Sequence, residues 1–153
     1  MVDIHHEGIC HAPRDVAFAY IDNYRTATQW MFGLAEFTPA GELDHGLGST
    51  FNGTFHVTPI KLHTTIEVTE WEEHTLIAFK SIKGFANESE WRFTSLGDAE
   101  TKITVTFRYE LPGGLAGKVM GRALEPIVAL SVWHSDAALR KHIEETYARS
   151  TQQ

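Results

Sequence analysis

The chain has few of the features that mark secreted, membrane and metal-rich proteins. Cys10 is the only cysteine among 153 residues, so no disulfide can form within the chain, as is usual in a reducing compartment. No uncharged apolar run is long enough to span a bilayer, and the first ten residues, MVDIHHEGIC, lack the basic and apolar regions of a secretory signal. We therefore expect a cytoplasmic location and no membrane insertion.

Positive charge is also scarce. The chain has 13 lysines and arginines against 20 aspartates and glutamates, which gives a formal net charge of −7, and the basic residues form no cluster. Binding to duplex nucleic acid depends on the neutralisation of phosphates by Lys and Arg. The composition therefore predicts that nucleic acid is not a partner.

The sequence also lacks segments that would divide it. Its five prolines and twelve glycines are scattered, and it contains no internal repeat or low-complexity run. With 42% hydrophobic and 22% charged residues, a chain of this length suits one globular domain with a sizeable core. We expect a single domain that covers residues 1–153.

The segment DIHHEGICH, residues 3–11, contains three histidines and the only cysteine, which raises the question of a metal site. Structural zinc sites combine a close ligand pair with a second pair elsewhere, and a second cysteine is lacking. In a strand, His5 and His6 point to opposite faces, and His6 and Cys10 are about 13 Å apart, too far to bind one ion. We expect no metal and no other cofactor, and we interpret these histidines as part of a polar pocket wall and as surface residues.

The first two thirds of the sequence show a strand pattern, then two short helical patterns and then a series of strand patterns. Alternation predicts a strand over residues 3–11, while Pro13 and the apolar spacing after it predict a short helix over 13–21 and a second near 24–32. From residue 37 to residue 110, blocks of period two are separated by turn residues. This pattern predicts an antiparallel meander of about six strands.

The last third contains one long amphipathic helical pattern after the glycine-rich turn LPGGLAG. At 100° per residue, charged residues that include Asp136 and Arg140 collect on one side, and apolar residues collect with Ser131 and His134 on the other. Pro126 lies inside the pattern and removes one backbone donor. We therefore expect a kink or a break of the helix there.

The order of these elements predicts the fold class. A strand, two short helices, a meander and a long C-terminal helix suit an α+β domain, in which a curved antiparallel sheet of about seven strands surrounds the long helix and the helices lie on one side. The gap between the sheet and the helix is the natural place for a pocket.

Several strings of the sequence resemble the START/Bet v 1-like superfamily, which has a helix-grip fold, and within it the bacterial polyketide cyclase/dehydrase and lipid-transport group. The resembling strings are CHAPRDVAFAYIDNY at residues 10–24, QWMFG around Trp30, GLGSTF at 46–51, EVTEWEE at 67–73, WRFTSLGDAETKITVTFRYEL at 91–111 and the closing helix. The resemblance covers nearly the whole chain, but its motifs identify a fold rather than a reaction. It implies a cavity for a hydrophobic or amphipathic small molecule, such as a lipid or a polyketide-like compound.

The resemblance also indicates which side chains face the pocket. Family members place apolar residues at alternate positions of the first strand, which here are Ile4, His6, Gly8 and Cys10, so His6 stands where the family often has Val or Ile. The short helices and early strands contribute aromatic residues, and the apolar face of the long helix contributes the rest. The predicted ligand-binding residues are His6, Trp30, Phe51, Phe55, Met120, Leu124, Ile127, Leu130, Ser131 and His134.

His134 is the main candidate for catalysis, and in the enzyme hypothesis His6 is a second group that could handle protons. On the apolar face of the helix His134 would be buried, and a neutral imidazole there can anchor a ligand carbonyl or hydroxyl, or act as a general acid or base in a cyclisation or dehydration. The alternative is a histidine whose ring nitrogens bond a strand hydroxyl or buried water. Glu88, Glu90 and Arg92 share a strand face, which we assign to solvent rather than to a pair of catalytic carboxylates.

Three functions therefore remain open. The first is binding of a hydrophobic small molecule between sheet and helix, and the second is a cyclase/dehydratase-type enzyme that uses a pocket histidine. The third is a regulatory or partner-binding module whose cavity is too small for a ligand. The cavity volume separates the third function from the other two, and we expect a monomer or a weak homodimer.

Overall fold

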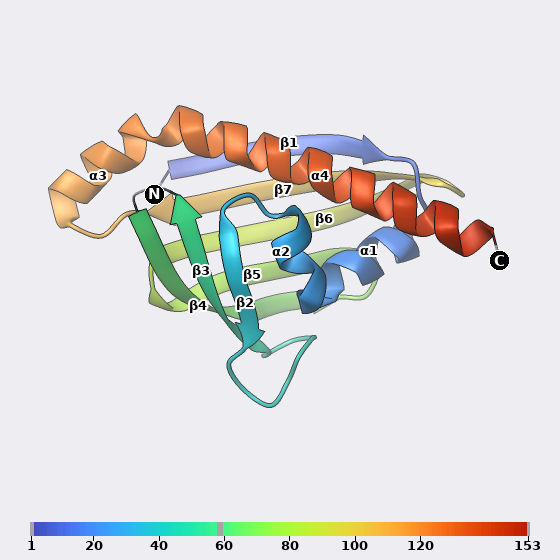
Figure 1. The fold of residues 1–153 in the computed structure, drawn as a ribbon, viewed down its shortest axis with the longest axis horizontal. Helices are drawn as coiled ribbons and strands as arrows, with labels where there is room; N and C mark the ends of the chain where they lie inside the picture. The colour runs from blue at the N-terminus through green and yellow to red at the C-terminus, as the bar shows by residue number, and fades with distance from the viewer. Residues whose placement is uncertain (1, 58–59, 153) are drawn as a thin grey trace.

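The computed structural model describes residues 2–57 and 60–152 as an antiparallel sheet that curves around one long helix (Figure 1). Within these ranges the seven strands are β1 (Val2–Cys10), β2 (Leu34–Pro39), β3 (Thr50–Val57), β4 (Ile60–Glu72), β5 (Leu76–Gly84), β6 (Ala86–Gly97) and β7 (Glu100–Glu110). Their order is β1-β7-β6-β5-β4-β3-β2, so the first strand pairs with the last and the other neighbours are consecutive. This arrangement confirms the predicted α+β helix-grip fold.

The short helices follow the first strand, as predicted, but with different bounds. α1 spans Arg14–Asp22, the 3-10 turn η1 spans Tyr24–Thr26 and α2 spans Ala27–Trp30. The carbonyl of Pro13 accepts the first hydrogen bond of α1, from the Ala17 N–H at 3.0 Å. Proline suits this place because it has no N–H to leave unpaired. The predicted helix over 24–32 is instead one 3-10 turn followed by one α-helical turn.

The C-terminal helical segment is broken, as expected near Pro126. α3 spans Gly114–Ala123 and α4 spans Glu125–Thr151, so Pro126 lies in the first turn of α4, where its missing N–H costs little. Gly113 precedes α3 with a φ of 112°, a left-handed conformation that favours glycine. Figure 1 shows α3 bent away from the axis of α4 beyond the end of the sheet. No helix in the described part of the chain is long and apolar enough to cross a membrane.

A fully buried part of the core lies where α4 packs against β1. Leu139 and Ile143 of α4 are fully buried in one hydrophobic cluster with Cys10 and Ile103. Burial of an aliphatic side chain of this size contributes about 1.5–3 kcal/mol. This region holds α4 against the sheet.

Burial alternates along β1, with the inward face that the family resemblance implies. Ile4 and Cys10 are buried, whereas His5 and Ile9 are exposed. Burial, and to a smaller extent the charge of Glu144, raises the pKa of the Cys10 thiol to about 12. A thiol with so high a pKa stays protonated and is a poor nucleophile at neutral pH.

Candidate functional site

A cavity of about 390 Å³ lies between the concave face of the sheet, the short helices and α4. Its volume falls within the range of about 300–1,000 Å³ that is usual for small-molecule pockets. Alternate residues of β3 to β7 form its floor, because successive side chains of a strand point to opposite faces. Residues that precede and begin α4 form its roof, which consists of Leu124, Ile127, Val128, Ser131, Val132 and Ser135.

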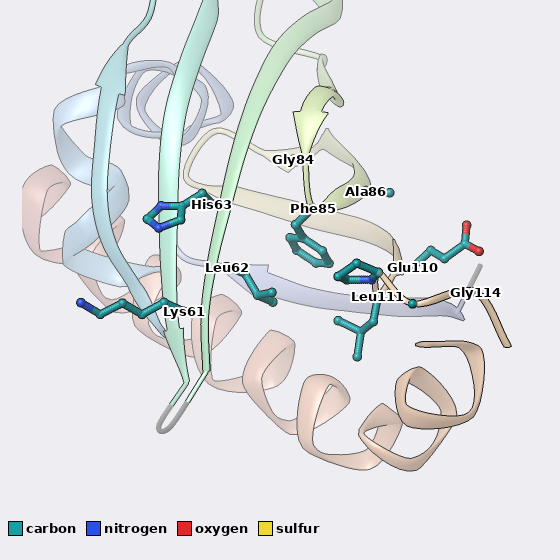
Figure 2. Close-up of a pocket in the computed structure, with 11 residues that line it drawn as sticks. Lys61, Leu62, His63, Gly84, Phe85, Ala86, Glu110, Leu111 and Gly114 are labelled. Atoms are coloured by element: carbon teal, nitrogen blue, oxygen red, sulfur yellow. The ribbon is translucent and has the colours of Figure 1, made fainter. Parts of the chain in front are cut away.

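An open depression of about 560 Å³ adjoins this cavity at one end (Figure 2). It lies between the start of β4, the β5–β6 turn and the loop from β7 to α3. Figure 2 shows Leu62, Phe85 and Leu111 turned toward the space between β4 and α3, whereas Lys61 extends away from it. The same three apolar side chains line the cavity. They therefore lie at the border between the cavity and the open depression.

The structure brings six of the ten predicted ligand-binding residues to the cavity wall. The aromatic rings come from α2 and β3, and the hydroxyl of Ser131 donates to the carbonyl of Ile127 at 2.9 Å. The six residues are Trp30, Phe51, Phe55, Leu124, Ile127 and Ser131. Their contact with a ligand stays a prediction.

Two of the other four, Met120 and Leu130, are 51% and 56% exposed and do not line the cavity. Met120 lies on α3, and because the helix is broken before Pro126, one helical projection does not describe both segments. Within α4 the inward stripe includes Val128 and Leu139. This stripe is displaced around the helix from the predicted face, so Leu130 points outward.

The expectation that His134 is buried is wrong for the same reason. His134 is exposed, with its ring stacked on Phe32 at 6.2 Å between centroids and in edge contact with Trp133 at 5.1 Å. The next residue, Ser135, faces inward, and its Oγ accepts a hydrogen bond from the Phe32 N–H at 2.9 Å. The proposed acid–base role of His134 in the cavity therefore loses its geometric basis.

Asp136 is fully buried, although the helical projection places it on the charged side of the helix. Its Oδ2 accepts hydrogen bonds from His6 Nε2 at 2.9 Å and from Arg140 Nε at 2.8 Å. A Cβ at Gly8 would lie 2.6 Å from this oxygen, so glycine leaves room for the carboxylate. His6 thus faces inward, as predicted, but bonds to α4 instead of lining the cavity. We call His6, Asp136 and Arg140 the β1–α4 clamp.

Several polar residues that line the cavity are absent from the set predicted from the sequence, and His45, Asn87 and Ser89 are among them. Nδ1 of His45, in the loop between β2 and β3, donates a hydrogen bond to Oδ1 of Asp44 at 3.0 Å, and this hydrogen bond raises the pKa of His45. Nothing in an unpatterned loop indicates such a residue. Asn87 and Ser89 also line the cavity. Strand alternation could have identified both. Glu88, which lies between them, is assigned to the solvent face, so its two neighbours must point to the opposite face.

A curved antiparallel sheet that holds an apolar cavity under a C-terminal helix defines the helix-grip class of proteins. The chain matches the model of the family described as polyketide cyclase / dehydrase and lipid transport over residues 1–144, and it belongs to that family. The resemblance to START/Bet v 1-like proteins is thereby confirmed. No curated protein matches the chain significantly.

Solved structures show the same fold at low sequence identity. TTHA0849 from Thermus thermophilus is 16% identical with a TM-score of 0.81, and the match covers 95% of this chain and 99% of that one. The Zhui aromatase/cyclase from Streptomyces sp. R1128 is 16% identical with a TM-score of 0.77, over 94% and 93%. A START superfamily protein from Mycobacterium smegmatis is 16% identical with a TM-score of 0.69, over 94% and 98%. At such identities the likeness shows the fold alone.

Proposed function

We propose that the protein binds a hydrophobic or amphipathic small molecule, such as a lipid or a polyketide-like compound, between the sheet and α4. The observation that carries this proposal is the cavity of about 390 Å³ with a mainly aliphatic and aromatic wall. Side chains around such a space lack packing partners. An apolar ligand would provide these contacts, and the transfer of its surface from water into the cavity would be favourable. The volume also argues against a module whose cavity is too small for a ligand.

Two further observations support the same class of ligand. The family description names polyketide chemistry and lipid transport, both of which concern largely apolar compounds. Leu62, Phe85 and Leu111 border both the cavity and the open depression, so movement of their side chains is the simplest route by which a ligand would enter. Binding is favoured over catalysis because the histidine assigned to proton transfer, His134, is exposed.

Fluorescence titration with 8-anilinonaphthalene-1-sulfonate, an amphipathic dye, tests the proposal. We expect saturable binding to the native protein. Ile66 lines the floor of the cavity and Val128 lines the roof. Ile66→Trp and Val128→Trp should each weaken dye affinity by about tenfold or more, because the indole occupies the space that the dye needs.

A surface variant separates the cavity from the exposed apolar side chains of α3. Leu115 is 79% exposed and does not line the cavity, so Leu115→Gln should leave the affinity unchanged. Circular dichroism would verify that each variant is folded. If Leu115→Gln weakened binding while both tryptophan variants bound normally, the dye would occupy the surface and the proposal would fail.

A further inference from the structure

Asn87 is a buried amide on the floor of the cavity. It belongs to β6, where it pairs with Tyr109 of β7 and alternates with the outward-facing Glu88. The hydroxyl of Tyr109 is already engaged, since it donates to the carbonyl of Gly121 at 2.6 Å. Of these two paired residues, Asn87 is therefore the one whose polar side chain is available to bond a ligand.

The hydrogen bonds of Asn87 fix the orientation of its amide. Nδ2 donates to the carbonyl of Phe85 at 2.9 Å and to Oγ1 of Thr64 at 3.0 Å, while the backbone N–H donates to Oγ of Ser81 at 3.0 Å. A backbone carbonyl can only accept, so the amide nitrogen and not the oxygen must face Phe85. Both hydrogens of Nδ2 are thereby used.

The remaining polar atom of this side chain is Oδ1, and within the described residues no protein donor bonds to it. A carbonyl oxygen in an apolar cavity loses free energy unless it receives a hydrogen bond. We propose that Asn87 Oδ1 accepts a hydrogen bond from a hydroxyl group of the ligand and thereby determines specificity. This inference rests on the proposed function and adds the chemistry of the bound molecule.

The ligand class is therefore an apolar body that carries an alcohol or phenol O–H on the part that reaches β6. A carboxylate is disfavoured there, because it has no hydrogen to donate and would place a charge beside an acceptor in an apolar wall. An ether or ester oxygen is disfavoured because it can only accept. Ser89, two residues along the same face, also lines the cavity and has a hydroxyl that can donate or accept, so it supplies the matched comparison.

The experiment uses 2-naphthol and 2-methoxynaphthalene, which share a ring system but differ in hydrogen-bond donation. Isothermal titration calorimetry gives the ratio of their two dissociation constants for each variant. Comparison of this ratio between variants cancels the different hydrophobicity of the probes. Asn87→Leu should reduce the relative preference for 2-naphthol by about fivefold, the size expected for one neutral hydrogen bond, and should leave 2-methoxynaphthalene binding nearly unchanged.

Unchanged binding of 2-methoxynaphthalene shows that the variant is folded. The fold should persist, because Oγ1 of Thr64 also donates to the carbonyl of Phe85, at 3.1 Å. If Asn87→Leu does not fold, Asn87→Val, which suits a strand and has no side-chain acceptor, should show the same loss. Ser89→Ala removes the neighbouring hydroxyl as a comparison, and the loss of preference should be larger in Asn87→Leu than in Ser89→Ala. An equal ratio in wild type and Asn87→Leu, or a loss confined to Ser89→Ala, overturns the role of Asn87. If the wild-type protein binds neither these probes nor 8-anilinonaphthalene-1-sulfonate, the proposed function fails as well.

Discussion

The two halves of α4 meet the same sheet in different ways. The anchored half, residues 136–147, packs directly on β1, with Leu139 and Ile143 fully buried and Asp136 held in the β1–α4 clamp. The cavity half, residues 125–135, covers an open space, and Ile127 and Trp133 are about half exposed. One helix thus provides most of its stabilising contacts at one end and leaves room for a ligand at the other. Stability and binding should therefore respond to different substitutions.

The largest effect is expected from core truncation in the anchored half. Leu139→Ala should lower the free energy of unfolding by about 3 kcal/mol, because it removes buried methyl groups and leaves a hole in a packed core. Val128→Ala, in the cavity half, should lower it by about 1 kcal/mol or less, because this side chain already borders open space. Denaturation with urea measures both values. Equal losses would contradict the division of α4 into two halves.

Removal of the clamp should have the next largest effect. Asp136→Ala should lower the free energy of unfolding by about 2–3 kcal/mol, because Asp136 is the buried acceptor for two side chains. His6→Val, the type of residue the family often has there, should cost about 1 kcal/mol, since Arg140 still bonds the carboxylate. Neither change should alter dye affinity.

A double-mutant cycle tests whether these two residues act as a unit. Once Asp136 is alanine, His6→Val should cost almost nothing more, which gives a coupling free energy of about 1 kcal/mol. Additive losses would indicate that His6 stabilises β1 by packing and that its bond to Asp136 contributes little.

The fold could be predicted from the sequence because strand alternation depends on the nearest neighbours in the chain. Alternation, together with the family resemblance, also places Cys10 and His6 on the inward face of β1. The inward face of the C-terminal helix was harder to predict. A helical projection assumes one unbroken helix, and this helix is interrupted near Pro126. Asp136 was wrongly assigned to the solvent side of the helix, because a carboxylate is normally exposed. Nothing in the sequence links it to its hydrogen-bond partner, a histidine 130 residues away. Cavity residues were therefore predicted better on α2 and β3 than on α3 and α4.

Thiol labelling compares the two halves of α4 without any large change in stability. It contrasts a buried thiol beside the anchored half with an exposed thiol in the cavity half. At pH 8 native Cys10 should not react with 5,5′-dithiobis(2-nitrobenzoate), because it is fully buried and its pKa is raised to about 12. It should react once the protein is unfolded in guanidinium. Ile127→Cys, in the exposed part of the cavity half, should add one thiol that reacts in the native state.

The direction of the Cys10 shift also predicts a pH dependence. The folded protein holds the thiol proton more tightly than the unfolded chain, whose thiol has an ordinary pKa of 9.0. The stability linked to Cys10 is therefore complete below pH 9 and declines as the pH rises from 9 toward 12. Cys10→Ala should remove this part of the decline in urea denaturation between pH 8 and pH 10.5, because alanine has no proton to lose. A decline of the same slope in both proteins would show that thiol ionisation does not limit the anchored half, and that other groups set its alkaline stability.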